Sequence, residues 1–322
     1  MMTERERFIK ALKREPLTGH VPTFELVFFL TMESLGKVHP SQRFYAQWDQ
    51  MSAAEKKAQI DDQADLYVQT ARKYHHSAIF VHPNPGDFDN TVRLLESIRE
   101  KSGDEQYFLM MHGDPTFAIP DGNNMEEFTC KMFEEEDALK EQAERQLENF
   151  IHMAQEYKKH PGLLDGFALC SDYCFNVNPF FSPAMFDEFI GPYLKRVLDA
   201  YREMGYYSIK HTDGNIMPIL DQMVECGPDA LHSLDPQGGV SLAEVKKRVG
   251  DRVAVVGNVN CGLLQTGTEE ECVADVRRAL REGMDGWGYI FSTSNCAYTG
   301  LPLERYELMN RIWWEEGVYP EQ

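Results

Sequence analysis

The chain has 322 residues, 43% of them hydrophobic, and a formal net charge of -20. This composition supports a large buried core and argues against disorder, and the acidic balance argues against nucleic acid as a partner because phosphate binding needs a basic patch. The charged N-terminal stretch is unlike a signal peptide, no apolar run reaches the roughly 18 residues of a membrane span, and the seven scattered cysteines make no disulfide framework. We therefore expect a cytoplasmic protein that binds no membrane and keeps its thiols reduced.

The predicted elements begin with a helix at about residues 3–13, where Thr3 and Glu6 form a capping box. Short apolar strands that end in polar residues then alternate with helix-like stretches. The predicted strands are 21–26, 78–83, 107–112, 166–172, 207–212, 230–235, 253–259 and 289–294. The predicted helices are 53–75, 89–101, 136–160, 183–204, 215–226, 242–249, 268–282 and 302–315. Eight such units predict one α/β domain over 1–322, a (β/α)8 TIM barrel with an N-terminal helix, and they place its chemistry at the carboxyl ends of the strands.

Two long irregular segments interrupt this rhythm, residues 27–52 after strand 1 and residues 113–135 after strand 3. The second is dense in turn residues, among them Asp114-Pro115 and Asp121-Gly122. Both leave the carboxyl end of the barrel, so we expect them to shape or cover the pocket. The aromatic side chains of the first segment either line a substrate site or pack on the barrel wall.

The sharpest local feature is residues 209–215, Ile-Lys-His-Thr-Asp-Gly-Asn, at the end of the fifth strand. At a strand-to-helix turn, His211 and Asp213 can present an imidazole nitrogen and a carboxylate to one point. That arrangement suits a metal site or acid/base chemistry. The alternative is that Asp213 caps the next helix and His211 is a hydrogen-bonded residue of the barrel mouth.

Cys296 lies in the polar loop after the eighth strand. Because all strand ends surround one pocket in a barrel, Cys296 can approach His211 and Asp213, and a His, Asp and Cys set suits zinc. Glu25 and Asp172, at the ends of strands 1 and 4, are further candidate ligands or bases. The alternative for Cys296 is an inert loop thiol.

Other strand ends carry polar side chains that can handle a substrate. We expect His82 and His112, at the ends of strands 2 and 3, to orient a substrate or fill the mouth rather than to bind metal. The remaining substrate-binding candidates are Tyr173, Asn176, Asn258 and Asn295. The chain has no G-x-S-x-G elbow, P-loop or early G-x-G-x-x-G motif, whereas a glycosidase-like pair could be drawn from Glu25, Asp172 and Asp235.

Several stretches carry a family resemblance. They are residues 5–12, 21–22, 181–189, 211–215, 257–260, 268–271 and 288–291. On these stretches the chain resembles the uroporphyrinogen decarboxylase superfamily, which also contains zinc-dependent, corrinoid-linked methyltransferases. The resemblance covers essentially the whole chain and implies the same barrel.

The branch follows from where the chain departs from the true decarboxylases. Those enzymes resemble one another in an arginine-rich stretch after strand 1 that grips the substrate carboxylates, but no arginine occurs here between Val21 and Gln42. Their essential aspartate follows strand 2, where this chain has His82. The methyltransferases resemble the chain better, because His211 and Cys296 match two of the zinc ligands in their His-x-Cys and second Cys motif.

The resemblance therefore implies a methyltransferase of the O-demethylase or methylcobamide type. It would move a methyl group between a small molecule and a corrinoid on a separate protein. Zinc would be held by His211, Asp213 (in place of the expected cysteine) and Cys296, with Asp172 and Glu25 as the next choices for ligand or proton transfer. A homodimer is also implied by the family.

Two alternatives stay open. One is a uroporphyrinogen decarboxylase-like lyase that acts on a tetrapyrrole without metal and uses Asp172 with His82 or His211 to handle protons. The other is a non-catalytic barrel that binds a tetrapyrrole or a corrinoid protein.

Overall fold

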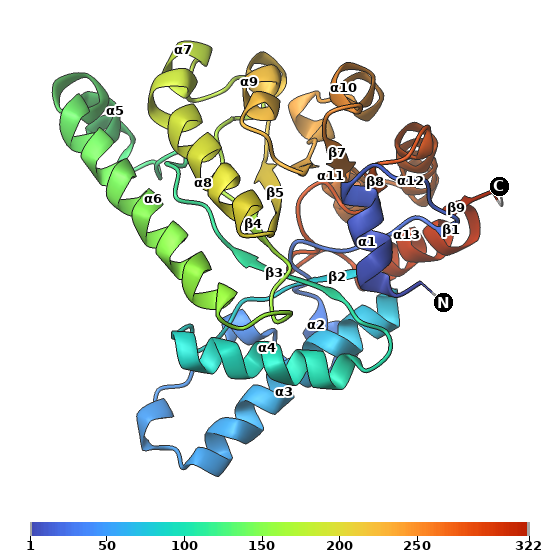
Figure 1. Ribbon diagram of the computed structural model, residues 1–322. Helices are drawn as coiled ribbons and strands as arrows, with labels where there is room; N and C mark the ends of the chain where they lie inside the picture. The colour runs from blue at the N-terminus through green and yellow to red at the C-terminus, as the bar shows by residue number, and fades with distance from the viewer. Residues whose placement is uncertain (1, 321–322) are drawn as a thin grey trace.

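The computed structural model describes residues 2–320. Its centre is a curled sheet of seven parallel strands, β2 to β8, which are neighbours in the order in which they occur in the chain. Helices surround the outside of the curl (Figure 1). The strands are β2 (Ala78–Phe80), β3 (Phe108–His112), β4 (Gly166–Leu169), β5 (Tyr207–Thr212), β6 (Ala230–Ser233), β7 (Ala254–Val256) and β8 (Tyr289–Ile290).

The predicted first strand, 21–26, is not a regular strand, so the prediction of eight strands in one sheet is corrected to seven for the described residues. Pro22 has no N–H to donate to a ladder, and only Thr23 forms an isolated bridge, to Phe291 beyond β8. On the other side, the carbonyl of Thr23 accepts a 2.6 Å hydrogen bond from Ser77, next to β2. The segment thus lies between the two edge strands and contacts both through a few bonds.

The predicted helices are present with shifted ends. The thirteen α-helices in residues 2–320 are α1 (Glu4–Leu12), α2 (Thr31–Leu35), α3 (Ala53–Tyr74), α4 (Phe88–Ser102), α5 (Met125–Glu134), α6 (Glu136–Lys158), α7 (Pro183–Met185), α8 (Gly191–Glu203), α9 (Leu220–Glu225), α10 (Leu242–Val249), α11 (Cys261–Thr266), α12 (Glu269–Met284) and α13 (Leu303–Glu316). Capping boxes begin α1, α3 and α12. Part of each irregular segment is helical, since α2 lies in 27–52 and α5 in 113–135.

The predicted helix 183–204 is divided. A π-helical turn, Phe186–Ile190, separates α7 from α8. Pro192, near the start of α8, cannot donate the backbone hydrogen bond that would continue the first helix. The predicted helix 215–226 is shortened to α9 in a similar way, because a 3-10 turn that contains Pro218 precedes it.

A separate two-stranded sheet joins the segment after α1 to the segment after α13. Antiparallel strands β1 (Gly19–His20) and β9 (Val318–Tyr319) pair there. Trp313 of α13 is buried and donates a 3.0 Å hydrogen bond to the carbonyl of Val21. Trp314 is partly exposed and stacks on His20. The predicted homodimer stays a prediction.

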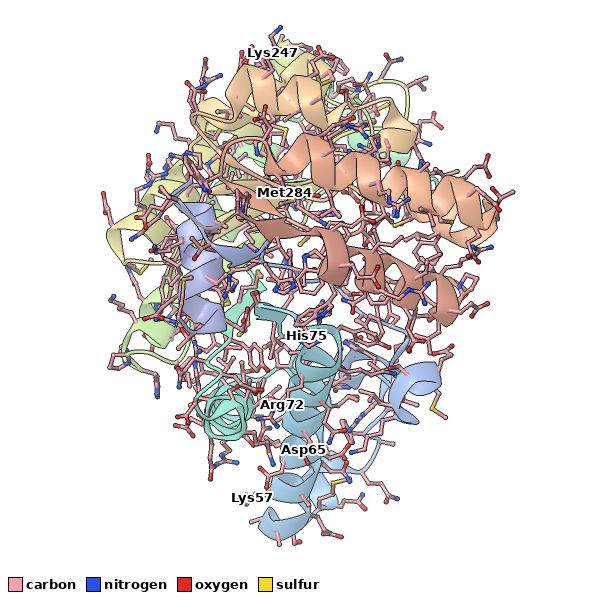
Figure 2. The ribbon with its side chains drawn as sticks, turned by 90° about the vertical axis from the view of Figure 1, so that its right-hand side faces the viewer. Lys57, Asp65, Arg72, His75, Lys247 and Met284 are labelled. Atoms are coloured by element: carbon pink, nitrogen blue, oxygen red, sulfur yellow. The ribbon has the colours of Figure 1, made fainter. Side chains whose placement is uncertain are left out.

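The long helices α3 and α4 pack side by side at the lower end of Figure 1. Charged side chains of α3, among them Lys57, Asp65 and Arg72, cover the outer surface seen in Figure 2. Asp65 pairs with Lys101 at 2.9 Å and Arg72 with Glu105 at 2.6 Å. Exposed pairs of this kind contribute little stability. Within residues 2–320, the helices all lack the combination of length and apolar character that spanning a membrane demands.

Candidate metal centre and active site

Three side chains converge at the carboxyl ends of β4 and β5. Asp172 lies in the loop after β4, His211 lies in β5, and Asp213 follows β5 directly. Each offers one ligand atom within 4.8 Å of the others, so the three could hold a metal ion. We call Asp172, His211 and Asp213 the metal group. The Nε2 atom of His211 lies 3.7 Å from an oxygen of Asp172 and 3.8 Å from Oδ1 of Asp213. Adjacent parallel strands bring their carboxyl ends to one edge, which explains the convergence.

His232 fixes the proton on His211. The Nδ1 atoms of the two rings lie 2.8 Å apart, and Nε2 of His232 lies 3.3 Å from the carbonyl oxygen of Thr293. A carbonyl only accepts, so Nε2 of His232 carries the hydrogen and its Nδ1 accepts from His211. Nε2 of His211 is then left with a lone pair directed at the two carboxylates. Burial lowers the pKa of His211 to about 4, which keeps the ring neutral and able to bind a metal.

One carboxylate oxygen of Asp213 lacks a hydrogen-bond partner among the described residues. Its Oδ1 is buried and has no hydrogen-bond partner among the described residues, whereas its Oδ2 accepts from the side-chain amide of Asn295. Burial, with the charges of Asp172 and Asp235 nearby, raises the pKa of Asp213 to about 7. An unpartnered buried carboxylate oxygen beside an imidazole lone pair is satisfied by a cation. The residues present therefore fit a divalent metal ion.

Gly214 allows the two loops of the site to touch. Its φ of +79° is left-handed, and a Cβ atom there would lie 2.5 Å from the carbonyl oxygen of Phe175. The backbone N–H of Asp213 donates a 3.0 Å hydrogen bond to Oδ1 of Asp172. The turn after β5 is thus held directly against the loop after β4.

Cys296, the thiol ligand implied by the resemblance, lies outside the group of three. It is half-buried, and burial raises the pKa of its thiol to about 12, with Cys261, Glu25 and Asp213 adding to the shift. The neighbouring Asn295 reaches Asp213, so the loop itself does approach the site. The role of Cys296 as a ligand stays a prediction.

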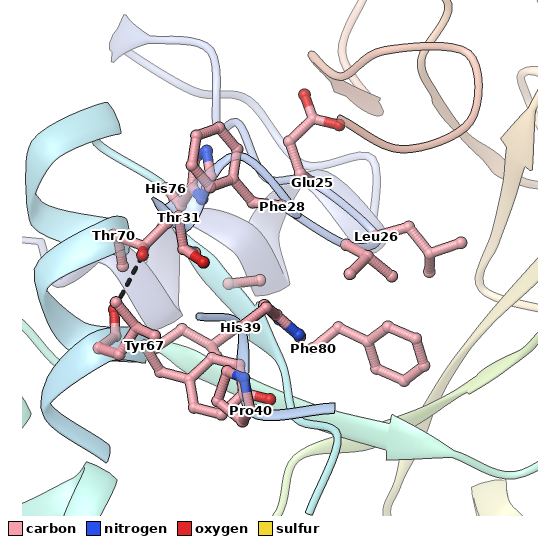
Figure 3. Close-up of a pocket in the computed structure, with 15 residues that line it drawn as sticks. Glu25, Leu26, Phe28, Thr31, His39, Pro40, Tyr67, Thr70, His76 and Phe80 are labelled. Carbon is pink, nitrogen blue, oxygen red and sulfur yellow. Dashed lines mark hydrogen bonds between the residues drawn. The ribbon is translucent and has the colours of Figure 1, made fainter. Parts of the chain in front are cut away.

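Glu25 is buried against the segment that follows β8. One oxygen accepts from the backbone of Thr293 at 3.2 Å and the other from its hydroxyl at 2.5 Å. Burial raises the pKa of Glu25 to about 7. Figure 3 shows its carboxylate turned away from His39, beside a cavity of about 30 Å³ that Thr31 and His76 also line. The cavity has room for about one water molecule.

His82 lies across the mouth from the metal group, after β2. Its Nδ1 is buried without a hydrogen-bond partner in residues 2–320, and burial lowers its pKa to about 4. The ring centroid of His39, from the segment after β1, is 5.9 Å away. His112 ends β3 with an exposed side chain. The structure thus gathers two neutral imidazoles in one place and leaves His112 on the surface.

Two predicted substrate-binding residues are engaged in the interior. The hydroxyl of Tyr173 is 2.6 Å from that of Thr116. The side-chain amide of Asn258 donates to the carbonyl of Leu234 at 2.7 Å and accepts from Arg278 at 3.1 Å. Asn176, in contrast, is exposed beside the mouth. Substrate contacts by these residues stay predictions.

Sequence reasoning missed His232 and the buried pair of Lys210 with Asp114. His232 lies directly opposite His211 in the register of β5 and β6, so a histidine inside the sixth apolar strand was the available signal. Lys210 and Asp114 have fully buried side chains 2.7 Å apart. A lysine within an apolar strand could have indicated them.

The sequence model of the uroporphyrinogen decarboxylase (URO-D) family matches residues 122–312, more than half of the chain. The chain therefore belongs to this family. It is 34% identical over 118 residues to a uroporphyrinogen decarboxylase of Anaeromyxobacter dehalogenans, a match that covers 37% of this chain and 32% of that protein. It is 40% identical over 125 residues to the chloroplastic enzyme of Zea mays, covering 38% of this chain and 30% of that protein. The chain thus spans about a third of the length of the curated relatives it matches.

Among solved structures, the chain is similar to a methyltransferase from Methanosarcina mazei. The TM-score is 0.73 at 19% sequence identity, and the match covers 98% of this chain and 99% of the other. The identity is too low for the likeness to show more than the fold. The fold of that protein and of this chain is the same over nearly their whole lengths.

Proposed function

We propose that the protein is a zinc-dependent methyltransferase that transfers a methyl group between a small molecule and a corrinoid carried by a separate protein. The proposed metal site is supported by the group of Asp172, His211 and Asp213. The imidazole of this group has a free lone pair, and one carboxylate oxygen has no hydrogen-bond partner among the described residues. We also infer that segment 21–26 takes the place of an eighth strand between β8 and β2. A single domain would then form a complete barrel around this site.

The chain's own residues have distinct roles in this proposal. Asp172, His211 and Asp213 hold the metal, and Cys296 is the candidate for a further ligand. Zinc, when bound, supplies a Lewis acid that activates a thiol acceptor or polarises the oxygen of a methyl donor. Burial raises the pKa of Glu25 to about 7, so this carboxyl can hold or release a proton near neutral pH at its position next to Thr293.

Electrostatics favours methyl transfer over decarboxylation of a polycarboxylate. The mouth holds the carboxylates of Asp172, Asp213 and Asp235, which would repel such a substrate. The first arginine after residue 21 is Arg43, and its guanidinium already pairs with Asp62 at 2.7 Å. No arginine lies in 21–42 to grip substrate carboxylates. The fold shared with the Methanosarcina mazei methyltransferase is consistent with this branch.

The rim of the mouth supports a protein partner. Large apolar side chains are exposed on the segments that leave the carboxyl ends of the strands. They are Met32, Val38, Phe44, Phe133, Phe175 and Val177. Large apolar side chains left exposed on the segments that follow strand ends suit a surface that another protein covers. A corrinoid protein docking here would present its cofactor to the metal group, whereas a free small substrate needs no such rim.

The family match favours a second candidate, decarboxylation of a porphyrinogen, because the curated relatives carry that name. The two candidates differ in what they need. A decarboxylase would release carbon dioxide from uroporphyrinogen in metal-free protein, which chromatography of the porphyrin products measures. A methyltransferase would leave uroporphyrinogen unchanged and lose its activity with its zinc.

Metal analysis tests the proposal. We expect purified wild-type protein to bind one zinc per chain, and His211→Ala to lose it. His152→Ala is the control, because His152 is an exposed histidine of α6 and does not belong to the group of three. Zinc bound equally by the wild type and by His211→Ala would reject the site. The predicted cytoplasmic location and homodimer are separate proposals that this experiment leaves aside.

A further inference from the structure

A buried ion pair lies directly behind the metal group. Nζ of Lys210 lies 2.7 Å from Oδ2 of Asp114, and both side chains are fully buried. Lys210 is in β5, immediately before His211, whereas Asp114 follows β3. The ammonium also lies 3.9 Å from the ring centroid of Tyr173. No step of the proposed methyl transfer uses this pair.

The pair forms hydrogen bonds with both the N–H and the carbonyl group of Ser171. Oδ2 of Asp114 accepts a 2.8 Å hydrogen bond from the N–H of Ser171, and Nζ of Lys210 donates a 2.8 Å hydrogen bond to its carbonyl oxygen. Ser171 directly precedes Asp172. The other oxygen of Asp114 accepts from the backbone and hydroxyl of Thr116, at 2.9 and 2.6 Å. Asp114 is therefore fully bonded, and each of its bonds restrains a segment beside the site.

A buried ion pair is a poor source of stability, because removing two charges from water offsets most of their attraction. Apolar side chains of the same volume would often stabilise a fold as well or better. What the pair does provide is direction, since both charged groups form hydrogen bonds of fixed geometry with the backbone next to two metal-binding side chains. Orientation of the neighbouring backbone therefore explains the position of this pair better than a contribution to core stability does.

We propose that Asp114 and Lys210 are positioning residues that set Asp172 against His211 at the distance a shared metal ion requires. This inference rests on the proposed metal function. Lys210 fixes the end of β5, Asp114 fixes the start of the loop after β4, and the ion pair locks the two together. Without it, Ser171 and Asp172 could move away from His211 although the strands remain in place.

The chain provides a matched control at the other end of the same strands. Asp165, just before β4, is also a buried carboxylate. It pairs with Arg99 at 2.7 Å and accepts a 2.9 Å hydrogen bond from the N–H of Leu109, in β3. Asp165→Asn and Asp114→Asn therefore remove the same kind of group from the same two strands. Only Asp114 adjoins the metal group.

The experiment measures zinc affinity by competition with a chelator, the absorption spectrum of the cobalt-substituted protein, and hydrogen exchange in residues 166–176. We expect Asp114→Asn to weaken zinc binding by about tenfold or more, as loss of an orienting group behind a metal ligand does. Its cobalt spectrum should change, and exchange in 166–176 should accelerate. Asp165→Asn should lower the melting temperature but alter zinc affinity by less than about twofold and leave the spectrum unchanged.

Thr116→Val is a milder variant should Asp114→Asn fail to fold. It removes one hydrogen bond to Asp114 and should weaken zinc binding by a smaller factor in the same direction. Equal zinc affinity in the wild type, Asp114→Asn and Thr116→Val would overturn the positioning role alone. Absence of zinc binding in the wild type would overturn the proposed function and this inference with it, so the two failures are distinguishable.

Discussion

The Nδ1 atoms of His211 and His232 lie 2.8 Å apart, at positions that face each other across β5 and β6. Because Nε2 of His232 lies against the carbonyl of Thr293, the hydrogen between the two rings belongs to His211. His232 thereby keeps Nε2 of His211, the nitrogen that faces Asp172 and Asp213, free of a proton. A ligand histidine oriented through its second nitrogen is a common arrangement in metal sites, although the partner is more often a carboxylate or a carbonyl.

Replacement of His232 should therefore reduce metal binding without touching a ligand. We expect His232→Leu to weaken zinc affinity by about tenfold, because His211 loses its acceptor and can adopt the other tautomer. His232→Asn is the matched variant, since its side-chain oxygen can accept from Nδ1 of His211, and it should retain most of the affinity. Zinc titration of the three proteins measures the effect. Equal binding by His232→Leu and the wild type would contradict the assigned tautomer.

Glu25 predicts a pH dependence of stability. Burial raises its pKa from the ordinary 4.5 to about 7. Between these values the folded protein holds a proton that the unfolded chain has released, so the free energy of unfolding falls as pH rises through this window. The stabilisation that Glu25 provides is complete below about pH 4.5 and is lost as pH rises through about 7. The total is on the order of 3 kcal/mol.

Denaturant unfolding of Glu25→Gln beside the wild type, from pH 4.5 to 8, measures this contribution. The amide cannot ionise, so we expect the difference in unfolding free energy between wild type and variant to shift in favour of the variant as pH rises. Glu33→Gln, at an exposed glutamate of α2, should follow the wild-type curve. A difference between wild type and Glu25→Gln that is constant with pH would show that the pKa of Glu25 is the same in the folded and the unfolded protein.

Alanine substitutions at Gly214 and Gly36 can be compared to distinguish the cost of a strained backbone from the cost of a steric clash at the site. Both have left-handed φ values, +79° and +69°. A Cβ at Gly36 would meet nothing within 4 Å, so Gly36→Ala should cost about 1 kcal/mol of stability from the backbone alone. A Cβ at Gly214 would collide with the carbonyl of Phe175 at 2.5 Å. Gly214→Ala should cost about 3 kcal/mol or more and also lower zinc affinity. Thermal unfolding with zinc titration measures both, and equal effects of the two substitutions would contradict the close contact.

The fold could be predicted where a short run of strand-forming residues is bounded by turns. The fifth strand was predicted at 207–212 and is β5 with those bounds. The prediction of a first strand at 21–26 was wrong, because it rested on the apolar pattern and did not consider that Pro22 has no N–H to donate. The positions of strand ends were readable from the polar residues that follow each apolar run. How many regular hydrogen bonds each strand forms depends on its neighbours, which one sequence does not display.

The site was predictable only in part, for a related reason. His211, Asp213 and Asp172 stand at strand ends, where the barrel pattern directs attention. His232 lies inside an apolar run, and its importance depends on a register between strands that sequence alone does not fix. Lys210 is read as a solvent-facing lysine unless its partner is known. That partner, Asp114, is 96 residues away in a segment interpreted as a loop.

Cys296 provides the last prediction. If Asp172, His211 and Asp213 are the principal ligands, Cys296→Ser should still bind one zinc per chain, with a smaller loss of affinity than His211→Ala. The thiol lies outside the group, although the amide of Asn295 ties its loop to Asp213. A modest movement of this loop would bring the sulfur to a bound ion, and the ion would then lower the thiol pKa from its value of about 12.

Cobalt substitution decides whether that movement occurs, because a thiolate on cobalt gives an intense charge-transfer absorption that carboxylate and imidazole ligands do not. A band present in the wild type and absent in Cys296→Ser would add the thiol to the ligand set. Complete loss of zinc in Cys296→Ser, equal to the loss in His211→Ala, would contradict the arrangement argued here. It would mean that the loop carrying Cys296 moves onto the ion as an obligatory part of binding, and that two carboxylates and one imidazole are not sufficient to retain the metal.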